Sequence, residues 1–306
     1  MVLIGMFHYR KKSHNIKIAY ACAAIAKMMG IDFIYFSYNA VDFNRNKINA
    51  WIFKDGNWTQ QNVRFPDSII NRSAPQTKEQ SIIHKVLKDI IPFTSHPVGS
   101  KMKVYKKIKE GQLFANYLIP TLNVSSSDKV LSFMKKYTRL VIKPNSGNKA
   151  RSIYFITLLE EDKVHCVIGL DETIYSLQEF KEFIIKLISK EKYLIQPFIE
   201  CKTKAGLTYD FRLHVQKNEI GKWVTTLIYP RISGNQKLTS NISSGGYRGE
   251  LIPFLIEEFG DQFYDVKQLL EHFTLSFATH FDTLYPNRTF DELGIDIAII
   301  EFIFLK

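Results

Sequence analysis

Residues 209–215, YDFRLHV, alternate between apolar and polar side chains along their whole length. A period of two is typical of a β-strand that buries one face and leaves the other polar. Asp210, Arg212 and His214 therefore share the polar face of the predicted strand. The aspartate and the arginine form either a structural ion pair or a pair that positions a substrate carboxylate and a phosphate. For His214, a simple hydrogen-bonded role is favoured over that of a catalytic base.

The segments around this strand predict an α+β body. Residues 223–230 predict its antiparallel partner, and residues 233–249, rich in Ser, Gly and Asn, predict a loop. Further strands are predicted at 140–143, 193–198 and 294–305, and helices at 100–117, 127–137, 176–190 and 261–281. The helix at 176–190 begins with SLQE, which is a capping-box sequence.

The first ninety-odd residues predict a smaller α/β domain. Strands at 2–7 and 31–37 flank a helix with Ile18, Cys22, Ile25 and Met29 on one apolar stripe. Such a β-α-β start favours a parallel sheet. A hairpin follows around Lys54-Asp55-Gly56. Prolines break the pattern after the next helix, so we predict one domain over 1–95 and a second over 96–306.

Composition excludes several classes of protein. The 306 residues are 45% hydrophobic, which is a globular value. No stretch of eighteen residues is continuously apolar, so no membrane span is expected. Three scattered cysteines suit a reducing compartment and a cytoplasmic location. The net charge of +11 is spread along the chain without a nucleic-acid-binding motif, so no nucleic-acid partner is expected.

A lysine closes one predicted strand immediately before a small-residue turn. Lys143 is followed by a proline and then by Asn145, Ser146 and Gly147. An ammonium group held at the end of a buried strand favours an anionic partner, and small residues let backbone N–H groups approach phosphate oxygens. The segment is neither a Walker A loop nor a GxGxxG motif, and by itself a plain surface turn is favoured.

Three further segments carry candidate site residues. The strand LIQPFIE (194–200) contains Gln196, Phe198 and Ile199 and either binds an adenine edge or is an ordinary core strand. Arg231 and the segment NISSGG (241–246), which begins with Asn241, either bind a transferring phosphoryl group or form a mobile loop. Asp296 interrupts an apolar strand, where it is either a magnesium ligand or a structural ion-pair partner.

In this order, the segments resemble the ATP-grasp superfamily and most closely its YheC/YheD-like group, described as endospore coat-associated. The resemblance covers nearly the whole chain. It implies an ATP-grasp fold, of mixed α/β and α+β character, preceded by a small α/β pre-ATP-grasp domain. Within residues 96–306 it implies a nucleotide-binding subdomain at about 125–200 and a C-terminal subdomain at about 201–306.

The resemblance also implies roles for individual residues. Lys143 and Lys101 would contact nucleotide phosphates together with the turn at Ser146 and Gly147. Gln196, Phe198 and Ile199 would form the adenine hinge. Asp210 and Arg212 would line the phosphate and acceptor side, Arg231 and Asn241 would face the transferred phosphoryl group, and Asp296 would bind Mg²⁺.

The implied activity is ATP-dependent carboxylate–amine ligation through an acylphosphate, with ATP and Mg²⁺ as cofactors. In the family, this aspartate is followed by a Glu-x-Asn pair. Here no Glu-x-Asn follows Asp296, and the one acidic residue after it is Glu301. We therefore expect either a truncated chain or an incomplete metal site. The alternative function is a catalytically impaired ATP-grasp module associated with spore-coat or envelope proteins.

Overall fold

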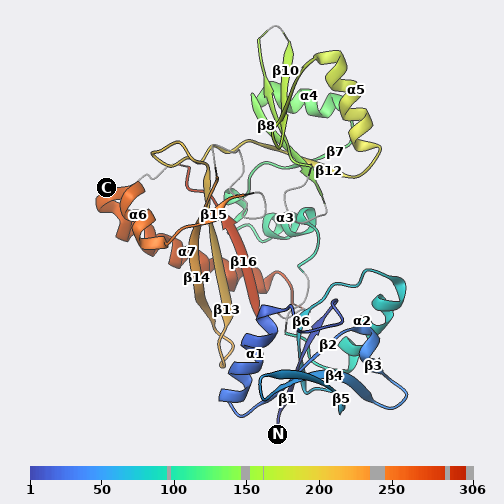
Figure 1. Ribbon diagram of the computed structural model, residues 1–306. Coiled ribbons are helices and arrows are strands. Elements are labelled where there is room, and N and C mark those ends of the chain that lie inside the picture. Colours follow the sequence, from blue (N-terminus) through green and yellow to red (C-terminus); the bar gives the residue numbers. More distant parts are fainter. Residues whose placement is uncertain (95–97, 146–151, 161, 235–244, 287–289, 301–306) are drawn as a thin grey trace. The chain divides into compact units, whose positions relative to one another are not determined.

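A computed structural model describes residues 1–94, 98–145, 152–160, 162–234, 245–286 and 290–300. The chain divides into two units. The N-terminal unit comprises Met1–Pro97 with Asn287–Asp291, and the C-terminal unit comprises Val98–Pro286 with Glu292–Lys306. Each unit is described by itself below (Figure 1).

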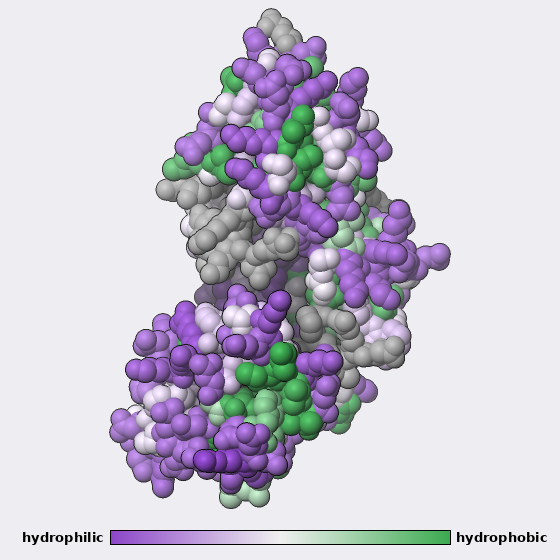
Figure 2. All heavy atoms as spheres, turned by 90° about the vertical axis from the view of Figure 1, so that its right-hand side faces the viewer, coloured by the Kyte–Doolittle hydropathy of each residue, from purple (hydrophilic) through white to green (hydrophobic). Residues whose placement is uncertain are grey.

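The N-terminal unit is built on a mixed sheet of order β3-β4-β2-β1-β6, with β5 paired to β4. Its elements are β1 (Leu3–His8), α1 (Lys17–Met28), β2 (Asp32–Phe36), β3 (Val41–Asp42), β4 (Lys47–Lys54), β5 (Asn57–Arg64), β6 (Ser68–Arg72) and α2 (Lys78–Ile90). Strands β2, β1 and β6 are parallel, as the β-α-β pattern predicts. Leu3 and Phe7 pack in one core with α2, whereas Met6 packs in another with α1, so both sheet faces are covered. On the face of this unit seen in Figure 2, mostly hydrophilic residues surround an apolar area.

The predicted apolar stripe of α1 is not its buried face. Ala19, Ala23 and Ala26 are buried, whereas Ile18 and Ile25 are 42% and 56% exposed. Cys22, expected in the core, is half-buried and packs against the core under α1, whereas Met29 of the same predicted stripe is exposed. The core under α1 holds large rings such as Tyr35 and Trp58. Small alanine side chains let the helix approach those rings closely, which the apolar pattern alone does not reveal.

The first part of the C-terminal unit is an antiparallel sheet of order β11-β10-β9-β8-β12-β7. Its elements are α3 (Lys101–Glu110), β7 (Leu122–Val124), α4 (Ser127–Lys136), β8 (Arg139–Pro144), β9 (Tyr154–Leu158), β10 (Lys163–Ile168), β11 (Asp171–Ser176), α5 (Leu177–Ile188) and β12 (Tyr193–Pro197). Buried residues of α4 and α5 pack with β8, β9, β10 and β12 in one core. Both halves of the capping box at Ser176 and Glu179 are formed.

The second part is a sheet of order β15-β14-β13-β16 with two helices against it. Its elements are β13 (Tyr209–Lys217), β14 (Trp223–Ile232), β15 (Tyr247–Arg248), α6 (Leu251–Phe259), α7 (Phe263–Thr283) and β16 (Glu292–Ile297). Phe211 and Leu213 of β13 are fully buried in a core with α6 and α7. The opposite face of the same strand is therefore the polar one.

Several predicted element boundaries are wrong. The helix expected at 100–117 ends at Glu110, followed by Gly111 and a left-handed Gln112. The strand expected at 294–305 covers Glu292–Ile297. Residues 298–300 are not part of a strand, and residues 301–305 lie outside the described part of the chain. Helix α6 and strand β11 were not predicted. Across the described residues, no helix combines the length and hydropathy needed to cross a membrane.

Candidate functional site

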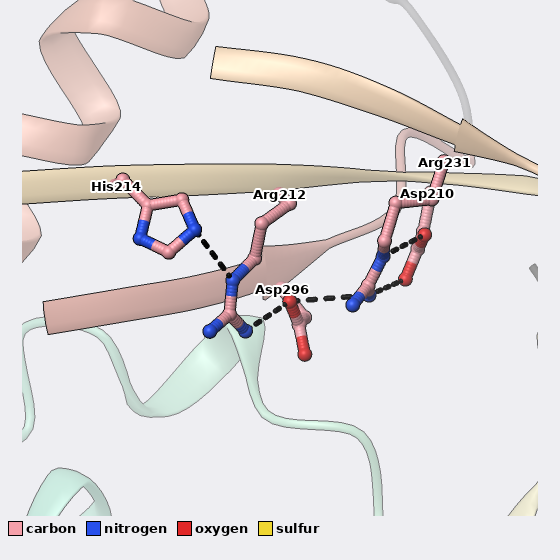
Figure 3. A network of polar contacts seen from close by, with 5 residues as sticks. All are labelled: Asp210, Arg212, His214, Arg231 and Asp296. Carbon is pink, nitrogen blue, oxygen red and sulfur yellow. Dashed lines mark hydrogen bonds and ion pairs between the residues drawn. The ribbon is translucent and has the colours of Figure 1, made fainter. Parts of the chain in front are cut away.

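A network of charged side chains lies on the polar face of the β13 sheet (Figure 3). Strand pairing places Asp210 opposite Arg231 of β14, and Arg212 opposite Asp296 of β16. The alternation of β13 sends Asp210, Arg212 and His214 to the same side, because successive side chains of a strand point to opposite faces. Residues that are up to 86 positions apart in the sequence therefore meet on one surface.

The network joins two arginines to two carboxylates. Arg231 donates to both carboxylate oxygens of Asp210, with an Nε–Oδ1 distance of 2.9 Å. Asp296 Oδ1 accepts from Arg212 Nη1 at 2.7 Å and lies 3.1 Å from Arg231 Nη2. The Arg231 side chain is only 16% exposed, whereas that of Asp296 is 48% exposed. The bidentate pair thus fixes Arg231, and Asp296 is the more accessible carboxylate.

Arg212 is held in place from three sides. Its Nε donates to Nε2 of His214 at 3.3 Å, in addition to the contact with Asp296. An accepting Nε2 requires a neutral imidazole, and burial together with the adjacent Arg212 lowers the pKa of His214. The guanidinium lies over Gly294, where an added Cβ would come within 2.6 Å of Arg212 Cζ. His214 is therefore hydrogen-bonded, as favoured from the sequence.

Two lysines approach each other at the end of β8. Lys143 belongs to β8 and pairs in register with Leu194 of β12. Lys101, at the start of α3, donates from Nζ to the carbonyl oxygen of Pro144 at 3.1 Å. Burial and the charge of Lys101 lower the pKa of Lys143 to about 8, and the negative charge of Asp296 opposes this shift. Burial also lowers the pKa of Lys101. Two partly desolvated ammonium groups at one place favour an anion there.

The predicted adenine-hinge residues lie at the end of β12 and just after it. The side chain of Gln196 is buried and donates from Nε2 to Tyr105 Oη at 2.8 Å and to Thr121 Oγ1 at 2.6 Å. Gln196 therefore links β12 to α3 and to the segment before β7. The sequence pattern did not reveal this contact.

Phe198 is fixed by β8 and β9. Its backbone N–H donates to the carbonyl oxygen of Arg139 at 2.8 Å, and the Arg139 guanidinium lies 4.5 Å from its ring centroid. Phe155 meets the same ring edge-on at 5.6 Å. Ile199 follows and is half-buried. An aromatic ring held on both sides gives the β12 end a fixed geometry.

The remaining predicted site residues, Ser146, Gly147 and Asn241, lie outside the described residues, as does Glu301. Within the described part of the chain, no group of three or more His, Cys, Asp or Glu side chains is placed to hold a metal ion. Mg²⁺ commonly uses only one or two protein carboxylates and takes its other ligands from phosphates and water. Asp296 fits that donor set as a single carboxylate ligand.

The comparisons identify relatives in sequence. A family model described as YheC/D like ATP-grasp matches residues 90–301. The chain is 24% identical over 257 residues to the endospore coat-associated protein YheC of Bacillus subtilis strain 168, covering 80% of this chain and 70% of YheC. It is 23% identical over 226 residues to the endospore coat-associated protein YheD of the same strain, covering 69% of this chain. The match spans about half of YheD, namely 49%.

Solved structures share the fold. A Chryseobacterium gregarium RiPP-associated ATP-grasp ligase, in complex with ADP and a leader and core peptide, has a TM-score of 0.51 and 14% identity. The match covers 97% of this chain and 85% of that one. The ADP complex of purK, an N5-carboxyaminoimidazole ribonucleotide synthetase, has a TM-score of 0.53 and 9% identity, covering 97% of this chain and 66% of that one. At these identities the likeness concerns the fold alone.

These matches confirm the predicted fold class, in which helices and strands combine in an ATP-grasp architecture. Because the family model extends over most of the sequence and includes β8, β12, β13 and β16, the chain belongs to the YheC/D-like ATP-grasp family.

Proposed function

We propose that this protein binds Mg-ATP and uses it to ligate a carboxylate to an amine through an acylphosphate. The observation that supports this most directly is the pair of lysines at the end of β8, where Lys101 Nζ donates to the carbonyl oxygen of Pro144, the residue after Lys143. Two partly buried ammonium groups at one place suit nucleotide phosphates, and Asp296 of the same unit presents a half-exposed carboxylate suited to a metal beside two arginines. ATP-grasp membership and the ADP-bound structures of the same fold agree with a nucleotide ligand.

The nucleotide would lie with its phosphates toward Lys143 and Lys101 and its adenine near Phe198 and Ile199. The ammonium groups would neutralise phosphate oxygens, and a bound phosphate would favour the protonated form of Lys143. Gln196 would act indirectly, because its amide already joins Tyr105 to Thr121. The turn at Ser146 and Gly147 would add backbone donors.

In the first chemical step, a substrate carboxylate oxygen would attack the γ-phosphorus, and the bond to the β–γ bridging oxygen would break. Arg231, fixed by Asp210, and Arg212, fixed by His214, would stabilise the negative charge on the transferring group. A bound Mg²⁺ would be held by Asp296 and would supply charge neutralisation at the phosphates. Asn241 would also face this group.

In the second step, the nitrogen lone pair of an amine would attack the acyl carbon, and inorganic phosphate would leave. The amine would lose a proton, so that the products are an amide, ADP and phosphate. The positions of the two arginines would supply most of the acceleration, because phosphoryl transfer depends chiefly on positioning and electrostatic stabilisation. The carboxylate and the amine would be small molecules or peptide groups.

A second candidate function is a non-catalytic module that associates with spore-coat or envelope proteins. It is favoured by the names of the two curated relatives and by the contacts that hold Asp296 between two arginines. This candidate predicts a folded protein that releases no ADP with any acceptor.

A thermal-shift experiment tests the nucleotide site. At about 1 mM ATP and a Kd of tens of micromolar, binding should stabilise the chain by about 2 kcal/mol. This is a rise of a few degrees in Tm. Lys143→Ala should abolish the rise, whereas Lys109→Ala, which removes an exposed lysine of α3, should retain it. No rise in the parent chain would contradict the proposal.

Ligase activity requires a separate measurement. ADP release should depend on an added carboxylate and amine and should be lost in Arg231→Ala. Release that continues unchanged in Arg231→Ala, or that needs no acceptor, would contradict the assigned chemistry. A nucleotide-induced shift without ADP release from any acceptor would favour the non-catalytic module.

A further inference from the structure

The N-terminal unit carries a concentrated positive charge where its first strand ends. β1 ends at His8, and the loop that leads to α1 contains the consecutive cations Arg10, Lys11 and Lys12. All three side chains are exposed. In the described part of the chain, none of the three is in an ion pair with a carboxylate. We call His8–Asn15 the basic loop.

The basic loop lies at the topological switch point of the parallel strands. β1 is the central strand of the three, with β2 on one side and β6 on the other. The chain leaves β1 for β2 and later returns to the opposite side as β6, so the direction of the strand order reverses at β1 and the carboxyl ends of β1 and β6 are adjacent. In open α/β sheets, ligands bind outside the carboxyl ends of strands at this point. His8 and Arg72, the last residues of β1 and β6, are register partners there.

Contacts with the sheet hold the basic loop in one conformation. Tyr35 Oη donates to the carbonyl oxygen of Arg10 at 2.8 Å, and Trp51 Nε1 donates to that of Lys11 at 2.9 Å. The ring of His14 meets Trp51 edge-on at 5.0 Å. Because the backbone carbonyls of two consecutive cationic residues are anchored to the sheet, the charged side chains extend from a fixed stretch of backbone. A preorganised base lowers the entropy lost on binding a ligand.

Two further features of the loop favour an oxyanion. Ser13 is fully buried, and its hydroxyl has no hydrogen-bond partner among the described residues. Its carbonyl oxygen accepts from the N–H of Ile16 at 2.8 Å, which leads the chain into α1. That helix begins without a side-chain cap and has no acidic residue in its first turn. Its first N–H groups therefore add positive potential to that of the cations.

The charge state of His8 is consistent with this positive field. Burial lowers the pKa of His8, and the charges of Arg10 and Arg72 lower it further. A neutral imidazole beside several cations can still donate a hydrogen bond to an anion from its ring N–H. An anion bound at this strand end would therefore contact both a hydrogen-bond donor and the cationic side chains of the basic loop.

We propose that the basic loop, with His8 and Ser13, binds the phosphate or carboxylate group of a small molecule. The recognised chemistry is a single oxyanion, because the fixed donors and cations are confined to one loop at one strand end. The proposal for the basic loop does not rest on nucleotide binding by the C-terminal unit.

The histidine-ring NMR signals of the full chain test the proposal. Inorganic phosphate and, in a separate titration, succinate are added while the His8 resonances are followed. At least one anion should shift them saturably, and the tighter of the two identifies the oxyanion. Arg10→Gln should weaken this Kd by about tenfold or more. Arg45→Gln, the same change in a surface ion pair of this unit, should alter it little.

A second variant of the basic loop and a control variant of the proposed nucleotide site complete the test. Ser13→Ala should also weaken binding, because the proposed site uses the buried hydroxyl as a donor, and its Tm shows whether the loop remains folded. Lys143→Ala should leave the His8 response intact, which separates this site from nucleotide binding. The proposal is overturned if neither anion shifts His8 saturably. It is also overturned if Arg10→Gln and Arg45→Gln weaken binding equally, because the attraction would then be diffuse.

Discussion

Gly294→Ala should displace Arg212 without removing it. A Cβ at this position would lie 2.6 Å from Cζ and 3.1 Å from Nε of Arg212, and it would also collide with Nη2. These distances are shorter than ordinary van der Waals contacts. The guanidinium must therefore move away from β16, and it would lose its 2.7 Å contact with Asp296 and its alignment with His214.

The expected effect on stability is small. A hydrogen bond between charged groups contributes about 1.5–3 kcal/mol in buried settings. The half-exposed carboxylate of Asp296 reduces this to about 1 kcal/mol. Replacing glycine in a strand by alanine returns about 0.5–1 kcal/mol. The two terms nearly cancel, so Tm should change by less than about 3 °C.

The expected effect on ligand binding is larger. In the proposed function, Arg212 contacts the γ-phosphate side of the nucleotide, which ADP lacks. Loss of one charge-assisted contact should weaken ATP binding by about tenfold, or 1.4 kcal/mol, relative to ADP binding. A change that acts on the fold in general would weaken both nucleotides alike.

Isothermal titration calorimetry with ATP and ADP on four proteins measures this effect. The proteins are the parent chain, Gly294→Ala, Arg212→Ala and the double variant. If alanine acts only by displacing the arginine, the double variant should match Arg212→Ala. Additive losses in the double variant, or equal weakening of ATP and ADP in Gly294→Ala, would refute the reasoning.

Three further outcomes are expected. Nucleotide affinity should fall as the pH rises through about 8, because burial and Lys101 lower the pKa of Lys143 to about 8 and a bound phosphate favours its protonated form. Calorimetry across pH should show this decline in the parent chain but not in Lys143→Ala. Gln196→Leu should leave the hydroxyl groups of Tyr105 and Thr121 without their donor and lower the unfolding free energy by about 1–3 kcal/mol, with little change in nucleotide Kd. A large loss of nucleotide affinity with unchanged Tm would instead indicate that Gln196 contacts the adenine. Asp210→Asn should lower the unfolding free energy by about 1–3 kcal/mol, because the largely buried Arg231 loses its bidentate carboxylate and keeps only its contact with Asp296. Denaturant titration measures this loss, and an unchanged denaturation midpoint would contradict it.

The polar face of β13 could be predicted because alternation is a local property of the sequence. Period two places Asp210, Arg212 and His214 together without any knowledge of the partner strands. The distribution of their contacts could not be predicted, because it depends on register. Asp296 faces Arg212 only because β16 pairs with β13 in one alignment, and a shift of one residue would direct its carboxylate away.

Side-chain size explains the other limits of the sequence patterns. Counting apolar residues assigned the larger side chains of α1, such as Ile18 and Ile25, to the core, whereas the helix packs through alanines such as Ala23. Gln196 shows the converse, since a polar residue in an apolar strand is buried because two hydroxyls lie within reach of its amide. Both outcomes depend on neighbours distant in sequence, which periodicity does not describe.

The two carboxylates of the network differ in how readily they can separate from their arginine partners. Asp210 binds Arg231 through both oxygens and is the less exposed of the two, so separating the pair would leave a guanidinium that is only 16% exposed with a single carboxylate contact, to Asp296 Oδ1. Asp296 uses one oxygen for both of its arginine contacts and is about half exposed. If Asp296 turns toward a cation, Arg231 keeps Asp210 and Arg212 keeps His214, so neither arginine is left without a partner. The geometry therefore separates an anchoring acid from an exchangeable one, and this separation makes Asp296 suited to a metal despite its contacts with two arginines.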